Sequence, residues 1–204
     1  YCKVSGGGNK GATGLRVLVV EESRGRARVL REALEAAGDE VVVSRGASLA
    51  LLKTVERVQP DVIVIDTESP TRDTLENLAV MGQHLPRPIV MFAADHAPET
   101  LRNVMRAGVA AYIVDGLDAA RVKSIVDVAC ARFEEYQRLR DELAATRMKL
   151  SERKLVERAK GLLMKSRGVD EEAAYGALRK LAMDRGRTLA EVAQQVIDAA
   201  ELLG

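Results

Sequence analysis

The stretch PDVIVID at residues 60–66 decides the fold of the first half of the chain. Four consecutive apolar, β-branched residues, bounded by proline and aspartate on one side and aspartate on the other, predict a short strand buried on both faces. Strands of this kind are typical of parallel sheets, whose two faces are covered by helices. Because ligands of such sheets bind at the carboxyl ends of the strands, Asp66 is a candidate functional residue.

The same alternation of apolar strands and amphipathic helices extends on both sides of this stretch. We expect the other strands at residues 15–20, 41–43, 89–92 and 112–114. Helices are expected between them, for example at residues 26–37 and 47–58. Five such repeats predict an α/β fold over residues 15–128, a doubly wound five-stranded parallel sheet of the flavodoxin type. The residues that leave its strands are Glu21, Asp66, Ala93 and Asp115.

The remainder of the chain is expected to be all-α. Residues 118–150 predict one long helix, and four of its side chains fall on the a and d positions of a heptad: Tyr136, Leu139, Leu143 and Leu150. We therefore interpret residues 129–150 as a coiled-coil linker; the alternative is a solvated helix that packs on its own first domain. Residues 151–204 predict three short helices, a unit with so little core that we expect it to be docked or dimerised.

Composition limits the classes of function. The 204 residues suffice for two domains, and the glycine-rich residues 1–14 are expected to form a flexible arm outside them. No apolar run is long enough for a membrane span and no secretory signal is recognisable, so we expect a cytoplasmic protein without a membrane partner. No nucleophile–base pair or complete set of metal ligands is visible, which argues against an enzyme.

Positive charge is concentrated at the start of the last segment. Residues 153–167 hold six Lys or Arg and one acid, Glu157, a local balance of +5 in a chain whose formal net charge is +1. Such a concentration on one short helix points to an anionic partner. A DNA-binding regulator remains an alternative, although its recognition helix would be the second helix and not the first. A purely protein-binding module is the other alternative.

Three short motifs in this segment resemble the ANTAR domain: ERAKGLLM at residues 157–164, EAAY at 172–175 and LR at 178–179. The resemblance implies a small helical RNA-binding output that acts in transcription antitermination. RNA hairpins are held through their phosphates and by stacking of splayed loop bases. The residues expected to bind RNA are Arg153, Lys154, Arg158, Lys160, Lys165, Arg167, Tyr175, Arg179 and Lys180.

The first domain, with PDVIVIDTESP at residues 60–70, resembles a response-regulator receiver domain. The resemblance places Asp66 at the phosphoacceptor position, and it places Glu21 and Glu22 at the acidic pair that holds Mg²⁺. Carboxylates are ligands that this hard cation prefers. We expect the crowded carboxylates to raise at least one pKa or to recruit a cation, for which Mg²⁺ is the candidate.

Two residues depart from the receiver pattern. Ala93 stands where the family has a Ser or Thr, and Asp115 stands where it has a Lys. The pocket is therefore expected to lack the cation and the hydroxyl that receive a phosphoryl group, and Asp115 adds a negative charge that repels it. We predict a pseudo-receiver that aspartyl phosphorylation does not switch. The alternative is a phosphorylation-activated ANTAR regulator of another pathway.

A longer similarity covers most of residues 15–204. The run AGVAAYIVDGL at residues 107–117, followed by ARF at 131–133 and RK at 153–154, resembles the NasT branch of antiterminators. This resemblance implies binding to paired hairpins in the leader mRNA of nitrate and nitrite assimilation genes, which prevents a terminator from forming. It also implies control by a NasS-like nitrate sensor protein. Two hairpins require two ANTAR units, so we expect a homodimer when the protein is active.

Overall fold

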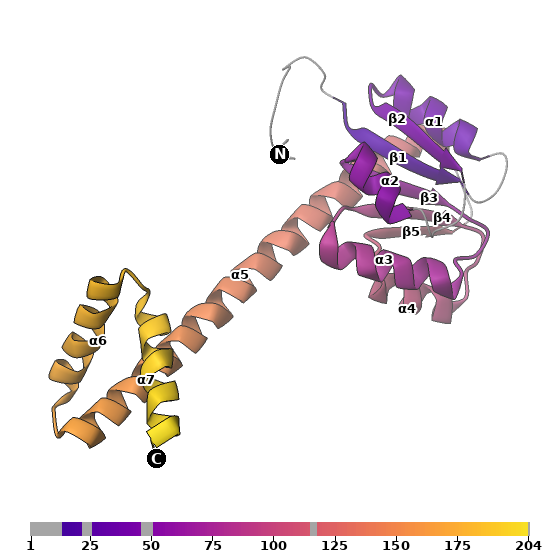
Figure 1. Ribbon diagram of the computed structural model, residues 1–204. Helices are drawn as coiled ribbons and strands as arrows, with labels where there is room; N and C mark the ends of the chain where they lie inside the picture. Colours follow the sequence, from indigo (N-terminus) through magenta and orange to yellow (C-terminus); the bar gives the residue numbers. More distant parts are fainter. Residues whose placement is uncertain (1–13, 22–25, 46–50, 115–117, 204) are drawn as a thin grey trace. The chain divides into compact units, whose positions relative to one another are not determined.

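The computed structural model describes residues 14–21, 26–45, 51–114 and 118–203. The chain forms two compact units, one up to Gln137 and one from Arg138 onward. Helix α5 (Ala119–Arg167) is continuous across this boundary (Figure 1). The predicted helix start at Ser151 is therefore wrong. Good helix formers flank Ser151 on both sides, so a backbone that could have formed a cap continues as helix instead.

The first unit contains the predicted five-stranded sheet. Its strands are β1 (Arg16–Glu21), β2 (Glu40–Arg45), β3 (Val62–Asp66), β4 (Ile89–Ala93) and β5 (Ala111–Val114). All neighbouring pairs are parallel, and the strand order is β2-β1-β3-β4-β5. The predicted α/β fold with a doubly wound parallel sheet, followed by an all-α segment, is thus confirmed.

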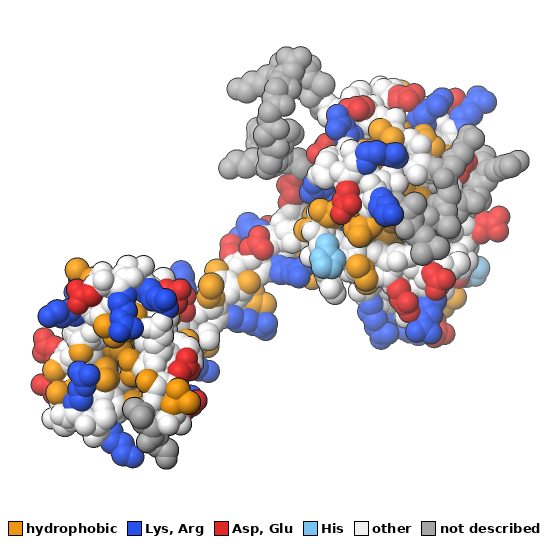
Figure 2. Space-filling model, in the orientation of Figure 1, with side chains coloured by type: hydrophobic (Ala, Val, Ile, Leu, Met, Phe, Trp, Pro, Cys, Tyr) orange, Lys and Arg blue, Asp and Glu red, His pale blue; other side chains and the backbone are white. Residues whose placement is uncertain are grey.

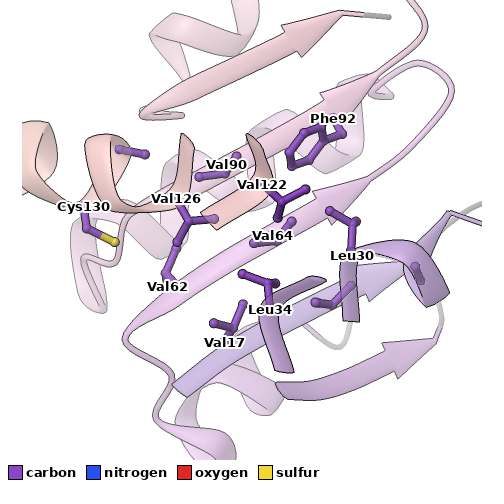
Figure 3. Packing of buried hydrophobic residues seen from close by; sticks show 13 residues of the cluster. Val17, Leu30, Leu34, Val62, Val64, Val90, Phe92, Val122, Val126 and Cys130 are labelled. Carbon is purple, nitrogen blue, oxygen red and sulfur yellow. The ribbon is translucent and has the colours of Figure 1, made fainter. Parts of the chain in front are cut away.

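Helices cover both faces of the sheet. They are α1 (Ala27–Ala36), α2 (Leu51–Val58), α3 (Arg72–His84) and α4 (Pro98–Arg106), together with the start of α5. Because side chains alternate along a strand, Val62 and Val64 pack in the cluster formed with α1 and α5 (Figure 3). Ile63 and Ile65 pack in the second cluster, with α2, α3 and α4.

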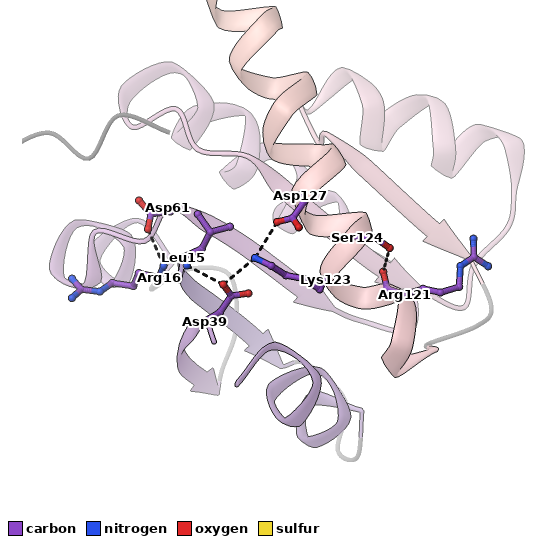
Figure 4. Close-up of polar contacts among 8 residues, drawn as sticks. All are labelled: Leu15, Arg16, Asp39, Asp61, Arg121, Lys123, Ser124 and Asp127. Atoms are coloured by element: carbon purple, nitrogen blue, oxygen red, sulfur yellow. Dashed lines mark hydrogen bonds and ion pairs between the residues drawn. The ribbon is translucent and has the colours of Figure 1, made fainter. Parts of the chain in front are cut away.

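A buried carboxylate fastens the start of α5 to the amino end of the sheet (Figure 4). The side chain of Asp39 is fully buried, and its Oδ1 atom accepts hydrogen bonds from the Leu15 backbone N–H at 2.9 Å and from Lys123 Nζ at 3.0 Å. Lys123 also pairs with Asp127, one turn further along α5, at 3.0 Å. Burial alone would lower the pKa of Lys123, but the hydrogen bonds to Asp127 and Asp39 outweigh it and raise the pKa.

The second unit is built from the end of α5, α6 (Glu171–Arg185) and α7 (Leu189–Leu203). Its core is small and consists of Ala159, Leu163, Ala174, Leu178, Ala182, Val192, Ala193 and Ile197. Side chains cap the starts of α6 and α7: Asp170 accepts a hydrogen bond from the Ala173 N–H, and Thr188 and Glu191 form a capping box. Gly186 ends α6 in the left-handed conformation, at φ 60°.

The predicted heptad side chains of α5 are exposed. The exposed fractions of Tyr136, Leu139, Leu143 and Leu150 lie between 51% and 63%. Figure 2 shows apolar side chains among charged ones along this helix. Both interpretations of residues 129–150, a coiled coil and a solvated linker helix, therefore stay predictions.

Throughout the part of the chain that the structure describes, no helix combines the length and apolar character that crossing a membrane requires.

Candidate functional site

The crevice at the carboxyl ends of the strands is built around Asp66. The parallel register places Glu21, the last residue of β1, beside Asp66, the last residue of β3. The Asp66 side chain is fully buried, and neither of its carboxylate oxygens accepts a hydrogen bond. Ala93 ends β4 and contributes no polar side chain. Glu22 and Asp115, the other members of the predicted acidic pocket, lie outside the described residues.

An arginine that the sequence analysis missed lies beside Asp66. Arg26 is the residue before the first turn of α1, and its Nε atom lies 3.0 Å from Oδ1 of Asp66. Its Nη2 atom donates a hydrogen bond to the backbone oxygen of Thr67 at 3.1 Å. The pocket therefore contains a positive charge that the sequence did not predict, although the Lys and the hydroxyl of the receiver pattern are replaced by Asp115 and Ala93. The positive charge comes from the start of α1 and not from the end of β5.

Asp66 has an unusual protonation equilibrium. Burial raises its pKa above the ordinary value, the Arg26 charge opposes this effect, and the Glu21 charge adds to it. The expected rise of a carboxyl pKa in this pocket is thus confirmed, but its leading cause is burial and not the crowding of carboxylates. Ionised Asp66 therefore depends on Arg26 as the positive charge nearest to it among the described residues.

The two loops beside the crevice are joined by a network around Asp95. The Asp95 carboxylate accepts hydrogen bonds from Ser69 Oγ at 2.8 Å, Thr100 Oγ1 at 2.9 Å and the Ala97 N–H at 2.8 Å. These bonds, led by the one from the Ala97 N–H, lower the pKa of Asp95. Tyr112 Oη donates to the Asp95 backbone oxygen at 2.6 Å. The loop after β3, the loop after β4 and strand β5 are therefore held together at the edge of the pocket.

The second unit carries the basic surface that the sequence predicts. Six of its predicted RNA-binding side chains are exposed and have no ion pair or hydrogen bond within the described part of the chain: Arg153, Lys154, Lys165, Arg167, Arg179 and Lys180. Figure 2 shows several Lys and Arg side chains on the visible face of this unit. Unpaired, solvated cations of this kind are available to an anionic partner without loss of an internal contact.

Lys160 differs from the other basic residues of α5. It is 7% exposed, and its Nζ atom lies 2.6 Å from Glu171 Oε1 and 2.9 Å from Glu157 Oε2. Hydrogen bonds to Glu171 and Glu157 raise its pKa. An RNA phosphate would have to displace both carboxylates to reach this ammonium. We therefore propose that Lys160 serves the packing of α5 against α6 instead of the predicted contact with RNA.

The remaining predicted RNA-binding residues lie on the surface. Arg158 is exposed but pairs with Glu201 of α7 at 2.6 Å, so this cation is partly neutralised. Tyr175 is 43% exposed, which leaves part of its ring accessible for stacking. Arg179 follows Tyr175 by four residues on α6, so the two side chains are neighbours on one side of the helix.

Comparisons with known proteins agree with this two-unit architecture. Residues 17–127 match the family described as Response regulator receiver domain, and residues 144–197 match the family described as ANTAR domain. The Transcriptional regulatory protein PdtaR of Mycobacterium tuberculosis (strain ATCC 25618 / H37Rv) is 31% identical over 183 residues, which cover 90% of this chain and 89% of that protein.

Two further matches are partial. The Nitrate regulatory protein of Klebsiella oxytoca is 38% identical over 80 residues, which cover 39% of this chain and 20% of that protein. A CheY-like response regulator receiver domain protein from Methanospirillum hungatei JF-1, known from its crystal structure, is 18% identical with a TM-score of 0.53. That match covers 61% of this chain and 99% of the other, and it shows a likeness of fold alone.

Proposed function

We propose that this chain, which belongs to the response regulators that join a receiver domain to an ANTAR domain, binds paired hairpins in a leader mRNA and prevents a terminator from forming. Proteins of this type are RNA-binding antiterminators and not enzymes. The observation that carries this proposal is the group of exposed, unpaired cations on α5 and α6. Phosphate contacts of this kind supply most of the affinity of a protein for nucleic acid.

The RNA-binding surface is proposed to consist of two sides of the small helical unit. On α5, Lys154, Arg158 and Lys165 follow each other at intervals of four and seven residues and share one side of the helix. On α6, the ring of Tyr175 and the guanidinium of Arg179 offer two planar groups on which unpaired loop bases stack. Arg153, Arg167 and Lys180 widen the positive field around these two sides.

We infer that the active protein is a homodimer whose partner helix covers the exposed heptad side chains of α5. With Tyr136 at an a position, the two glutamates Glu135 and Glu142 fall at successive g positions. The two arginines Arg140 and Arg147 fall at successive e positions. In a parallel, in-register pair, each g glutamate lies opposite the e arginine of the other copy. An antiparallel pair would instead bring arginine opposite arginine. The charges thus support a parallel coiled coil, which presents two ANTAR units together.

We further propose that the regulated genes are those of nitrate and nitrite assimilation and that a NasS-like sensor protein controls the chain in the cytoplasm. The motifs at residues 107–117 and the partial match to a nitrate regulatory protein support this assignment. Control by a partner instead of by aspartyl phosphate is supported by Asp66 itself, because its buried carboxylate is already paired with Arg26. A phosphoryl group on Asp66 would first have to displace that pair.

A gel-shift titration tests the proposed output. The full chain is titrated against a tandem-hairpin RNA and against the same sequence as duplex DNA, at two salt concentrations. We expect a preference for the RNA, weakened by salt and by Lys165→Ala. Arg121→Ala is the matched control, since Arg121 is an exposed cation on the same helix but within the receiver unit. Equal or tighter binding to DNA, or binding to neither, contradicts the proposal.

A further inference from the structure

An ion pair between Arg158 and Glu201 joins α5 to the end of α7 within the small helical unit. The Nη2 atom of Arg158 lies 2.6 Å from Oε1 of Glu201, which belongs to the last turn of α7. Both side chains are more than half exposed. Because solvent screens a pair in such a place, the two side chains are held together weakly, and another charged group can take the place of either partner.

Arg158 lies between two exposed lysines on the same side of α5. Lys154 precedes it by four residues and Lys165 follows it by seven. Neither lysine has an ion pair within the part of the chain that the structure describes, whereas Arg158 has a carboxylate within hydrogen-bonding distance. A carboxylate offers a guanidinium the same kind of anionic oxygen ligand as a phosphate does. Glu201 therefore occupies the ligand position that an RNA phosphate would take on this side of α5.

The last turn of α7 has little else to hold it. Ile197 is 1% exposed and packs in the core, but Leu202 in the last turn is 86% exposed. The turn contains no lysine or arginine, although the partial negative charge at the end of a helix favours a cation there and disfavours an acid such as Glu201. Arg158 supplies this cation from α5. The ion pair therefore stabilises the end of α7.

We propose that Glu201 competes with RNA for Arg158, so that RNA binding replaces this carboxylate with a phosphate and releases the last turn of α7. Glu201 lowers the affinity for RNA in two ways: its pair with Arg158 has to be broken, and its charge repels the phosphates. The inference rests on the proposed binding of RNA. It adds to that function a residue that limits the affinity and a segment whose stability changes when RNA binds.

The first measurement is the affinity of the full chain for the tandem-hairpin RNA, by gel-shift titration. Glu201→Gln removes the competing charge, and Asp198→Asn is the matched control, because Asp198 is an exposed acid of α7 that accepts a hydrogen bond from Gln194. We expect Glu201→Gln to bind about fivefold more tightly than the wild type and Asp198→Asn to change the affinity less than about twofold. In an Arg158→Ala background, the two substitutions are expected to have equal effects, since there is no pair left to break.

The second measurement is amide hydrogen exchange in the last turn of α7, residues 200–203, followed by nuclear magnetic resonance. A wild-type protein saturated with RNA is expected to exchange these amides faster than the free protein does, because the turn has lost its cation. Arg158→Ala is expected to exchange them faster without RNA, and Lys154→Ala, which removes an unpaired cation one turn earlier on α5, is expected to leave their exchange unchanged.

Equal affinities of Glu201→Gln and Asp198→Asn for RNA would contradict the competition and leave the proposed RNA binding standing. Slower exchange of residues 200–203 in the RNA complex than in the free protein would also contradict it. If no protein binds the RNA, the proposed function fails and the competition fails with it. Circular dichroism establishes whether Arg158→Ala is folded; if it is not, the comparison of Glu201→Gln with Asp198→Asn decides, because both variants keep the arginine.

Discussion

The Nζ atom of Lys160 lies 2.6 Å from Oε1 of Glu171 and so joins α5 to α6 within the three-helix unit. A basic residue in the middle of an RNA-binding motif thus has a structural contact. We expect Lys160→Ala to lower the thermal midpoint of this unit by several degrees, because the substitution removes a cation shared by two carboxylates. Lys165→Ala, which removes an exposed and unpaired cation, is expected to leave the midpoint unchanged. Thermal unfolding followed by circular dichroism checks both. Equal midpoints for the two variants would contradict this division of roles.

The same ion pair makes the stability of the three-helix unit depend on pH. The hydrogen bond from Lys160 holds the pKa of Glu171 below the ordinary value. A carboxyl whose pKa is lower in the folded state stabilises that state above its unfolded pKa, and the contribution is lost as the pH falls through the folded pKa. We expect the difference in thermal midpoint between wild type and Glu171→Gln to be constant at neutral pH and to shrink in acid. Glu172→Gln is the control, since Glu172 lies beside it in the first turn of α6 and is exposed.

How much of the fold and of the candidate sites could be predicted from the sequence depends on how far apart along the chain the interacting residues are. The apolar runs predict all five strands, and Asp66 is found because it directly follows one of them. Arg26 is not found, because its contact with Asp66 joins residues 40 positions apart through a loop whose path the sequence does not specify. For Lys160 the sequence does indicate burial. This residue follows buried Ala159 and precedes buried Leu163 by three residues, so helical spacing places Lys160 at the edge of the core.

The salt dependence of RNA affinity should report the number of phosphates that the protein contacts. Each phosphate that a lysine neutralises contributes about one counter-ion to the slope of log affinity against log salt, somewhat less for single-stranded loops. We expect Lys154→Ala and Lys165→Ala each to reduce that slope by roughly one. Lys160→Ala, measured at a temperature where it is folded, is expected to leave the slope unchanged. Titrations of the tandem-hairpin RNA over a range of salt concentrations give the slopes directly, and a reduced slope for Lys160→Ala would return this residue to the RNA-binding surface.

The exposed heptad side chains lead to a prediction about assembly. Leu143→Asp places a charge on the a position at the middle of the exposed seam, where the partner helix would have to bury it. We expect the variant to be a monomer by sedimentation velocity, with an unchanged circular dichroism spectrum and with loss of tight binding to paired hairpins. Glu134→Asp, outside the a and d positions, is the control. A wild-type chain that is monomeric both free and bound to RNA would rule out the coiled-coil dimer.

Asp66 is expected to destabilise the receiver in its ionised form. Because its pKa is raised in the folded state, chiefly by burial, the folded protein binds the proton more tightly than the unfolded chain does. Stability is therefore greatest below the unfolded pKa and is lost as the pH rises through the folded pKa. Asp66→Asn removes this dependence. We expect it to raise the receiver's thermal midpoint by about 2–4 °C at about pH 8 and by much less at about pH 4. Arg26, one-third exposed, can then be hydrated by solvent.

Lys123 offers the sharpest test of what holds α5 to the receiver. Lys123→Ala leaves the fully buried Asp39 carboxylate with the Leu15 N–H as its remaining donor, while Asp39 Oδ2 already accepts no hydrogen bond. Since an uncompensated buried charge is costly and Lys123 is partly exposed, we expect a loss of about 2 kcal/mol in the free energy of unfolding, measured with urea. Asp127→Asn, which removes the exposed partner of the same lysine, is expected to cost about 0.5 kcal/mol.

The double variant separates charge from packing. Asp39→Asn in the Lys123→Ala background removes the buried charge, while its amide oxygen can still accept the Leu15 hydrogen bond. We expect it to recover part of the lost stability, because an unpaired neutral amide costs less to bury than an unpaired carboxylate. If the double variant is less stable than Lys123→Ala, the lysine acts mainly by packing its methylene chain on the sheet, and the ion pair with Asp39 contributes little to holding α5.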